Sequence, residues 1–463
     1  MKTSITALLM VFSLFIYGQA EEGSGIRRFT LEQAQTYALQ HNYTLLNQEK
    51  EIEIAQQQIR ETASLFLPQI SANYELRANP IIQPVGFDVT QPLFPGQQPP
   101  APPGTESSFE YVTIGGGNWQ TSAGVTANWF IGSYSNFLAK KASEVLREMR
   151  SLGKEEAELA VNSEVSKAFN RVLLAQESVK LLEEDLASLQ KNLYETRQLF
   201  QNGFVEEQDV DQIDLLASNI DNSLENAKRQ EELTMQILKF QMGIPLDENI
   251  EIEGSLDESL RRVEERLIKI EETKLDLENH VSYKIANSQY KASVLEFRNE
   301  RADFYPTLGF TANYNNFYLS QDFDPLNFNT YWAPAAFVTG RVTWDLFTGL
   351  ANHAQAQQAK IGIQQAEVNR ERTRNQIQLE YEQARSDFLF ALRNYRNSKK
   401  SVDLSEKIRD RTRIKYVEGL SSSLDLSQTE TQYVRSQQDY IRALQSLINA
   451  KENLEEALGI NNF

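Results

Sequence analysis

The sequence predicts a mainly helical chain that carries two amphipathic β-hairpins, an α-rich fold with a β-barrel part continued by a long helical stalk. All four tryptophans, and every proline except Pro245, fall in two windows, residues 67–131 and 305–347. Outside these windows Glu, Gln, Lys, Arg, Leu and Ala recur with helical spacing. Two kinds of structure therefore alternate along the chain.

Composition narrows the function classes. With 64 Asp and Glu against 46 Lys and Arg, an acidic chain is a poor partner for nucleic acid. The absence of cysteine excludes disulfides, thiolate metal sites, a cysteine nucleophile and a lipidated N-terminal cysteine. The histidines (His41, His280 and His353) are scattered without ligand spacing. We therefore expect no metal site and no cofactor.

Residues 1–20 have the pattern of a signal peptide. Lys2 precedes an apolar run from Ile5 to Tyr17, and Gly18-Gln19-Ala20 provides small residues for cleavage. The alternative is an ordinary N-terminal helix. No later stretch approaches eighteen apolar residues. We expect an exported protein without membrane-spanning helices.

Inside the two windows apolar residues recur at every second position, as in strands with one apolar and one polar face. The apolar sets are Ile70, Ala72, Tyr74, Leu76 and Ala78; Ala123, Val125, Ala127, Trp129 and Ile131; Leu308, Phe310, Ala312 and Tyr314; and Val338, Val342, Trp344 and Leu346. Prolines from Pro80 to Pro103 indicate a long extended loop between the first two strands. The second hairpin has a shorter loop, residues 321–329.

Two structures fit such strands: a soluble sheet with one face on a core, or a transmembrane barrel with its apolar face in lipid. The barrel is favoured because the strand lengths suit a tilted bilayer crossing and aromatic residues lie near the strand ends. These interfacial aromatics are Tyr74, Trp119, Trp129, Tyr314 and Trp344. Four strands cannot close a barrel, and lipid does not tolerate an open sheet edge. Several copies must therefore pool their strands.

The helical segments indicate a tandem duplication. An uninterrupted helical pattern over residues 134–202 predicts a helix of roughly 100 Å, and a matching one follows the second hairpin. Glycines end these long helices in similar contexts, LFQNGFVEEQDVDQ at Gly203 and KYVEGLSSSLDLSQ at Gly419. The returning helices end at Gly243 and Gly459, which are separated by the same number of residues. We therefore predict repeat 1 at 21–246, a linker at 247–257 and repeat 2 at 258–463.

Several motifs resemble those of the TolC-like outer membrane efflux protein family. They are FTLEQAQTYALQHN at the start, SLFLPQI and ADFYPTL at the helix-to-strand junctions, TWDLFTGL and more weakly ANWFIGSY after the hairpins, and the two glycine turns. The resemblance covers essentially the whole mature chain. It implies a homotrimer whose twelve strands close one barrel in the outer membrane of a Gram-negative bacterium, with a coiled-coil tunnel through the periplasm.

The resemblance also implies partners and site residues. The tunnel would dock on a periplasmic adaptor of an inner-membrane pump, in efflux or type I secretion, and export small molecules or proteins without chemical change. The docking tips would be Gly203, Phe204, Val205, Gly419, Leu420 and Ser421. Asp209 and Tyr416 match tip residues whose hydrogen bond keeps the closed end shut, and Asp425 matches an acidic ring at the constriction. The sequence departs from the family at Gln428, where a second ring aspartate is expected, and at Ser421, which replaces a basic residue.

Alternatives remain at both levels. The alternative for Asp425 is a solvated turn aspartate, and the alternative for the whole chain is a non-conducting coiled-coil tether of the envelope. A tether explains the helices and the export signal but not the amphipathic hairpins. For an enzyme the sequence offers no nucleophile motif, phosphate-binding glycine loop or metal cluster. We therefore expect no enzyme activity.

Overall fold

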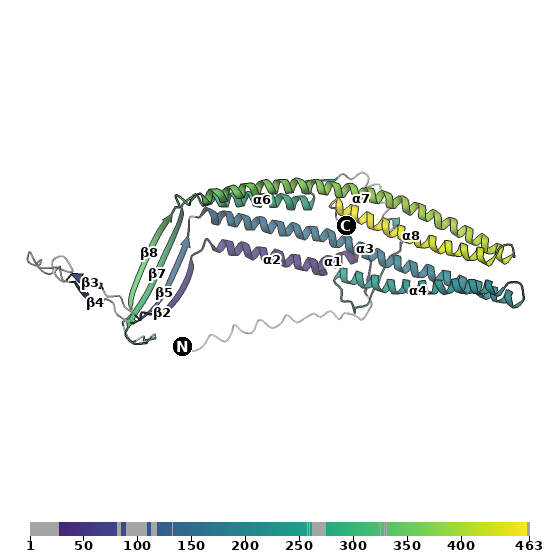
Figure 1. The fold of residues 1–463 in the computed structure, drawn as a ribbon, viewed down its shortest axis with the longest axis horizontal. Coiled ribbons are helices and arrows are strands. Elements are labelled where there is room, and N and C mark those ends of the chain that lie inside the picture. Colours follow the sequence, from purple (N-terminus) through teal and green to yellow (C-terminus); the bar gives the residue numbers. More distant parts are fainter. Residues whose placement is uncertain are drawn as a thin grey trace, which may run out of the picture. The chain divides into compact units, whose positions relative to one another are not determined.

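The computed structural model describes residues 27–80, 85–88, 109–112, 118–131, 133–256, 258, 260–261, 275–324, 326–327, 329 and 331–460. Its helices are α1 (Leu31–His41), α2 (Tyr43–Ser64), α3 (Tyr134–Gln201), α4 (Glu207–Met242), α6 (Val281–Ala302), α7 (Ala351–Val417) and α8 (Ser423–Ala457). Its strands are β1 (Arg27–Phe29), β2 (Gln69–Ala78), β3 (Val85–Asp88), β4 (Phe109–Val112), β5 (Trp119–Phe130), β6 (Ile250–Ile252), β7 (Thr307–Ser320) and β8 (Ala333–Thr343). The prediction of a mainly helical chain is confirmed (Figure 1). The predicted signal peptide lies outside the described residues.

The chain divides into two compact units, and each takes segments from both halves of the sequence. The helical unit consists of Met1–Glu49, Gly153–Tyr283 and Arg374–Phe463. The sheet unit consists of Lys50–Leu152 and Lys284–Thr373. The proposed tandem repeat stays a prediction, although α3 and α7 have 68 and 67 residues, and α4 and α8 have 36 and 35.

The sheet unit contains one antiparallel sheet in the order β2-β5-β7-β8. Figure 1 shows these four strands side by side. The register places Ile70, Ala127, Ala312 and Val338 in one row, so the apolar sets predicted for the four strands share one face. Ile70 is 72 % exposed and Val338 78 %. The apolar face of the sheet is therefore uncovered within the described chain.

The opposite face of the sheet is joined by side-chain hydrogen bonds between β5 and β7. Thr311 Oγ1 donates to Asn128 Oδ1 at 3.0 Å, and Asn313 Nδ2 donates to Thr126 Oγ1 at 2.7 Å. These strands come from the two different hairpins. The contacts between them fix the register at which the hairpins join.

Each helix-to-strand junction is held by a tryptophan from the second strand of its hairpin or just beyond it. Trp129 Nε1 donates to the carbonyl of Phe66 at 2.9 Å, and Trp344 Nε1 donates to the carbonyl of Phe304 at 3.1 Å. Both carbonyls lie two residues before the proline that directly precedes the first strand of each hairpin. A proline disfavours helix in the residue before it. The tryptophan then satisfies a carbonyl left free where the helix ends.

The helical unit is held together by three apolar clusters along its length. One cluster joins α1, α3 and α4 through Ala38, Phe169 and Met242. It also contains Phe29 of β1 and Ile250 of β6. A second joins α7 and α8 through Phe388 and Leu444, among others. The third packs α3 on α4 through Leu189 and Ile220 and includes Val434 of α8. These residues repeat at three- and four-residue intervals, as in the predicted coiled-coil seams.

Two short strand pairs were missed by the sequence analysis. β1 pairs in parallel with β6, which lies inside the predicted linker 247–257. Three-residue strands are too short to show a period. In the first hairpin, β3 pairs with β4, so part of the expected extended loop is a ladder. This is sterically allowed because Val85–Asp88 lies between Pro84 and Pro92 and contains no proline.

Alanine substitutions at two glycines should separate steric clash from backbone strain. Gly203 (φ +77) has open space where a Cβ would lie, whereas a Cβ on Gly243 (φ +75) would lie 2.2 Å from the carbonyl oxygen of His41. Gly203→Ala should therefore cost only the left-handed strain, about 1–2 kcal/mol. Gly243→Ala should lower the thermal unfolding midpoint by clearly more, and equal midpoints would contradict the close packing of α1 on α4.

Candidate functional site

The predicted gate and docking residues lie where two helical hairpins of the helical unit end. The first hairpin is α3 from Gly153 with α4, and the second is α7 from Arg374 with α8 (Figure 1). The two turns have the same construction. The N–H groups of Gly203 and Phe204 donate to Phe200 and Leu199, each at 2.9 Å. Those of Gly419 and Leu420 donate to Tyr416 and Lys415 at 3.0 and 2.7 Å.

This bonding is the Schellman arrangement, which needs a left-handed residue after the helix. Gly203 and Gly419 have φ values of +77° and +75°, and glycine adopts them without steric cost. Each glycine is followed by a large apolar side chain, Phe204 at 77 % exposure and Leu420 at 74 %. Val205 and Ser421 are half-buried. Each turn therefore presents one apolar residue to solvent from a defined backbone.

Asp209 and Asp425 occupy equivalent positions in the helices that follow the turns. Each is the third helical residue and closes a capping box. Asp209 Oδ2 accepts from the Glu206 N–H at 2.9 Å. Asp425 Oδ2 accepts from the Ser422 N–H at 3.1 Å, while the Asp425 N–H donates to Ser422 Oγ at 3.1 Å. The segment Ser422-Ser423-Leu424-Asp425 carried this signal in the sequence, and the sequence analysis did not use it.

The exposed carboxylate of Asp425 is stabilised in its charged form. Hydrogen bonds from the Ser422 hydroxyl at 2.8 Å and the Ser422 N–H lower its pKa, as does a bond from the Ser421 hydroxyl at 3.1 Å. Gln428 lies three residues further along α8, on the same side of the helix, and is also exposed. The arrangement suits both an anionic group at a pore and a capping aspartate in a solvated turn.

The two hairpins meet through a pair of hydroxyl contacts near their turns, which we call the tip contact. Tyr416 of α7 hydrogen-bonds through its hydroxyl to Thr196 Oγ1 of α3 at 3.2 Å. The Ser423 hydroxyl of α8 donates to Asp209 Oδ1 of α4, and its oxygen also lies 3.1 Å from Gln212 Oε1. Asp209 and Tyr416 thus each bind a different residue of the opposite hairpin.

Burial and position explain why these groups form the contact. Thr196 is 1 % exposed and Ser423 is 4 % exposed, so their hydroxyls need partners within the protein. Burial raises the pKa of Tyr416, the Thr196 hydrogen bond opposes that rise, and the nearby negative charge of Asp209 adds to it. The phenol therefore stays neutral and keeps its proton at physiological pH. Thr196 and Ser423 were missed because nothing in the sequence shows which hydroxyl residue of a polar segment has a partner on another helix.

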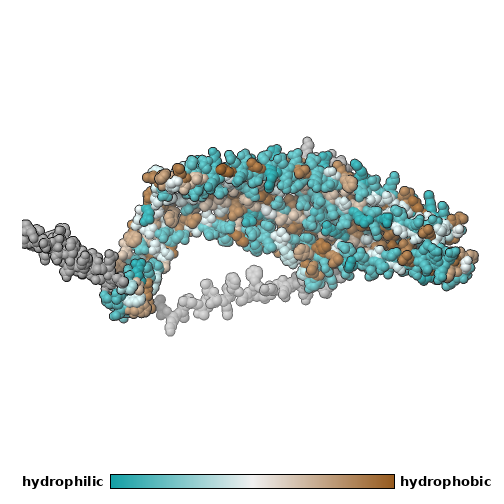
Figure 2. Space-filling model, in the orientation of Figure 1, coloured by the Kyte–Doolittle hydropathy of each residue, from teal (hydrophilic) through white to brown (hydrophobic). Residues whose placement is uncertain are grey.

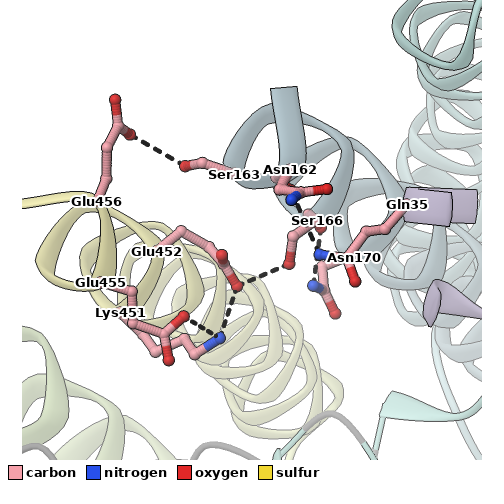
Figure 3. Close-up of polar contacts among 9 residues, drawn as sticks. All are labelled: Gln35, Asn162, Ser163, Ser166, Asn170, Lys451, Glu452, Glu455 and Glu456. Carbon is pink, nitrogen blue, oxygen red and sulfur yellow. Dashed lines mark hydrogen bonds and ion pairs between the residues drawn. The ribbon is translucent and has the colours of Figure 1, made fainter. Parts of the chain in front are cut away.

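A buried polar cluster joins α8 to α3 further along the helical unit (Figure 3). Lys451 Nζ lies 2.9 Å from Glu452 Oε1 and 2.7 Å from Glu455 Oε2, and all three residues are buried. Across the interface, the Ser166 hydroxyl of α3 donates to Glu452 Oε1 at 2.6 Å. Such groups do little for net stability but disfavour wrong helix pairings, because a slipped pairing leaves charges buried and unpaired.

Three further contacts extend this cluster on both sides. Ser163 Oγ donates to Glu456 Oε2 at 3.1 Å, and Asn170 Nδ2 donates to the carbonyl of Ser166 at 2.8 Å. From α1, Gln35 Nε2 donates to the carbonyl of Asn162 at 3.4 Å. Figure 3 shows these side chains converging from α1, α3 and α8. The cluster therefore specifies how three helices from both halves of the chain meet.

The predicted interfacial aromatics lie in the sheet unit. Tyr74, Trp129, Tyr314 and Trp344 are between 41 % and 58 % exposed. Trp119 is half-buried and lies edge-on against Phe323, with ring centroids 4.8 Å apart. The structure thus leaves the outer parts of these rings available for contact.

No group of three or more His, Asp or Glu side chains could hold a metal ion within the described ranges. His41 is stacked on Tyr37 with centroids 4.0 Å apart, and its Nδ1 lies 3.0 Å from the Tyr37 carbonyl oxygen. None of the helices in the described residues is both long enough and apolar enough to cross a membrane. The face shown in Figure 2 is largely hydrophilic over the helices, with separate hydrophobic patches.

The family model described as outer membrane efflux protein matches residues 36–243 and 277–460. No curated protein matches this sequence. Among solved structures, the chain is similar to the outer membrane protein VceC from Vibrio cholerae (16 % identity, TM-score 0.66, covering 93 % of this chain and 96 % of that one). It is also similar to the CmeC outer membrane channel of Campylobacter jejuni (16 % identity, TM-score 0.69, covering 93 % of this chain and 85 % of that one). A third similar structure is the open state of the MtrE outer membrane channel of Neisseria gonorrhoeae (18 % identity, TM-score 0.66, covering 93 % of this chain and 88 % of that one).

Replacing Lys451 should test the buried cluster. Lys451→Met leaves two buried carboxylates without their cation, and breaking a buried pair in this way costs about 3–5 kcal/mol. Lys191 forms an exposed pair with Glu195 at 4.0 Å, so Lys191→Met should cost less than about 1 kcal/mol. Denaturant unfolding followed by helical circular dichroism compares the two. If both variants lose the same small amount, Lys451 is not the counter-ion of a buried site.

Proposed function

The chain belongs to the outer membrane efflux protein family, and on that premise we propose that it is the outer-membrane exit duct of a tripartite efflux or type I secretion system. It forms a homotrimer, extends into the periplasm, docks on a periplasmic adaptor of an inner-membrane pump, and passes small molecules or proteins outward unchanged. The observation that carries this proposal is the amphipathic sheet β2-β5-β7-β8, whose apolar face is exposed. That face is where outer-membrane lipid packs.

Closure of the barrel explains why more than one copy is needed. Within the described chain β2 and β8 are the edges of the sheet. Because neighbours alternate in direction, β8 of one copy lies antiparallel to β2 of the next. A head-to-tail contact of this kind closes when the rotation completes a ring. Three copies supply the even number of antiparallel strands that outer-membrane barrels have.

An exposed apolar stripe on α7 supports contact between copies in the helical part as well. Leu379, Phe390, Leu404 and Ile408 are between 47 % and 70 % exposed. They are separated by close to whole numbers of helical turns and so lie on one side of α7. An apolar stripe along a polar helix is typical of a helix that packs on another helix.

The tip contact and Asp425 provide the gate in this proposal. Separating the hairpins breaks the Tyr416–Thr196 and Ser423–Asp209 bonds. The similar MtrE channel was solved in an open state, which supports the proposal of a channel that opens. In a trimer, three Asp425 carboxylates surround one axis, which attracts cations. The exposed Phe204 and Leu420 serve as anchors for the adaptor, because an apolar side chain gains by leaving water.

Conductance in a planar lipid bilayer tests the duct. We expect small single-channel conductance from the wild-type protein and larger conductance from Tyr416→Phe, which lacks the hydroxyl bonded to Thr196. A large wild-type conductance unchanged by the variant keeps the duct and removes the latch. Absence of conductance from folded, inserted protein favours the non-conducting envelope tether.

Ion selectivity tests the acidic ring. The reversal potential in a KCl gradient should show cation preference in the wild type and less of it in Asp425→Asn, whose amide still accepts the capping bonds. Asp221→Asn, which removes an exposed acid from α4, should leave the potential unchanged. If both variants behave like the wild type, Asp425 is only a capping residue.

A further inference from the structure

A cluster of ionisable side chains lies inside the helical unit where α3 meets α7 and α8. Asp185 of α3 is 9 % exposed and Glu430 of α8 is 5 % exposed. Arg409 of α7 lies over the ring of Tyr433, with its Cζ 3.9 Å from the ring centroid. The positive charge of Arg409 acts on both buried carboxyl groups. The sequence analysis assigned no role to Asp185, Arg409 or Glu430.

The carboxyl groups are incompletely satisfied. Asp185 Oδ2 and Glu430 Oε1 are buried without a hydrogen-bond partner among the described residues. Arg409 instead directs its Nε and Nη2 to Asp410 on its own helix, at 3.1 and 2.9 Å. A buried carboxylate without hydrogen bonds is costly, and taking up a proton removes its charge. The geometry thus favours a neutral form of at least one of the two acids.

The surrounding charges point the same way. Burial raises the pKa of Asp185 to about 7; Arg409 opposes the rise, while Glu430 and Glu184 add to it and a hydrogen bond from Gln437 opposes it. Burial also raises the pKa of Glu430, against the positive charges of Arg409 and Arg413 and with the negative charge of Asp410. These groups come from all three helices that meet at the cluster.

The cluster spans the interface between the two hairpins. Asp185 belongs to the first hairpin, while Arg409, Glu430 and Tyr433 belong to the second. Towards the turns, Arg413 Nη1 donates to Ser188 Oγ at 3.5 Å and Tyr416 is bonded to Thr196. A movement that separates the hairpins at their tips therefore exposes these carboxyl groups to water.

We propose that the Asp185–Glu430 pair is a proton-binding site that holds the two hairpins together, so that protonation favours the joined state and loss of the proton favours separation. This deepens the proposed function and rests on it, since it takes separation of the hairpins as the opening movement. Acid then closes the duct, and neutral to alkaline periplasm permits opening.

The sign follows from proton linkage. The joined state has the raised pKa of Asp185, about 7, and a water-exposed aspartate has its ordinary value of 3.8. Between these values the joined state binds more protons, so it loses stability as pH rises. Below pH 4 its full stability is present, and above pH 7 no further loss occurs. The raised pKa of Glu430 acts in the same direction.

Cysteine labelling can test this because the chain has no cysteine of its own. Thr196→Cys places a thiol at the tip contact, where Thr196 is 1 % exposed. A thiol is a weaker hydrogen-bonding group than a hydroxyl and loosens the Tyr416 contact at every pH, so the readout is the change of labelling with pH and not its absolute rate. Tyr194→Cys, at a position that is 66 % exposed on the same helix, corrects for the chemistry of the thiol. The rate of maleimide labelling at position 196 divided by that at 194 measures opening in the purified full-length protein.

We expect this ratio to rise at least about tenfold from pH 5 to pH 8; one proton allows at most about tenfold per pH unit. With Asp185→Asn, an uncharged equivalent of the protonated acid, the ratio should be low and flat. Glu430→Gln should reduce the slope and serves if the first variant does not fold. A flat ratio in the cysteine proteins that keep Asp185 and Glu430, or an unchanged slope in both substituted forms, overturns the proposal.

The labelling ratio and the conductance can fail separately. A conducting channel with a flat ratio overturns the proton site and keeps the duct. A pH-dependent ratio in protein that never conducts supports the proton site between the hairpins and overturns the duct. Parallel rise of ratio and conductance with pH, both abolished by Asp185→Asn, supports the two together.

Discussion

Backbone hydrogen bonding at the edges of the sheet is the constraint on which the rest of the proposed structure depends. Lipid offers no donors or acceptors, so a spanning sheet must pair every strand. A chain with four strands and two edges in the described sheet can meet this requirement only with other copies. In the proposed trimer the helices share the rotation axis of the barrel, and residues near that axis form rings. An otherwise ordinary capping residue such as Asp425 gains its proposed role in this way.

The elements themselves could be predicted because their signals are local. Alternation from Ile70 to Leu76 has a period of two, and the long helices contain no proline, so the strands and long helices were predicted as elements. The bounds were less accurate in the second hairpin, because β7 continues to Ser320 and β8 ends at Thr343, before the predicted Trp344 and Leu346. The turns were predicted because Gly203 and Gly419 adopt a backbone that other residues avoid. The short strands β1 and β6 were not, because three residues show no period.

Partners across helices could not be predicted from the sequence. Lys451, Glu452 and Asp185 have the composition of a solvated helix face, and only tertiary packing buries them. Likewise, nothing local shows that Tyr416 meets Thr196 while Asp209 meets Ser423. The candidate gate and docking residues lie together at the ends of the helical hairpins, as their place beside the glycine turns indicated, while their contacts required the structure and their role stays a prediction. The capping role of Asp425, by contrast, could be predicted from the segment Ser422-Ser423-Leu424-Asp425 alone.

The emptiness around the turn glycines has an evolutionary consequence. Apart from the glycine and its chain neighbours, no atom lies within 4 Å of the place where a Cβ would lie on Gly203 or Gly419. The backbone of each turn is held by hydrogen bonds of its own N–H groups. The conformation of each turn therefore does not depend on neighbouring side chains. The residues that follow the glycines can therefore change without altering the packing of the helices next to the turns. If the tips dock on a partner as proposed, a few surface substitutions there are enough to change the partner, while the packed helices and the sheet keep their sequences.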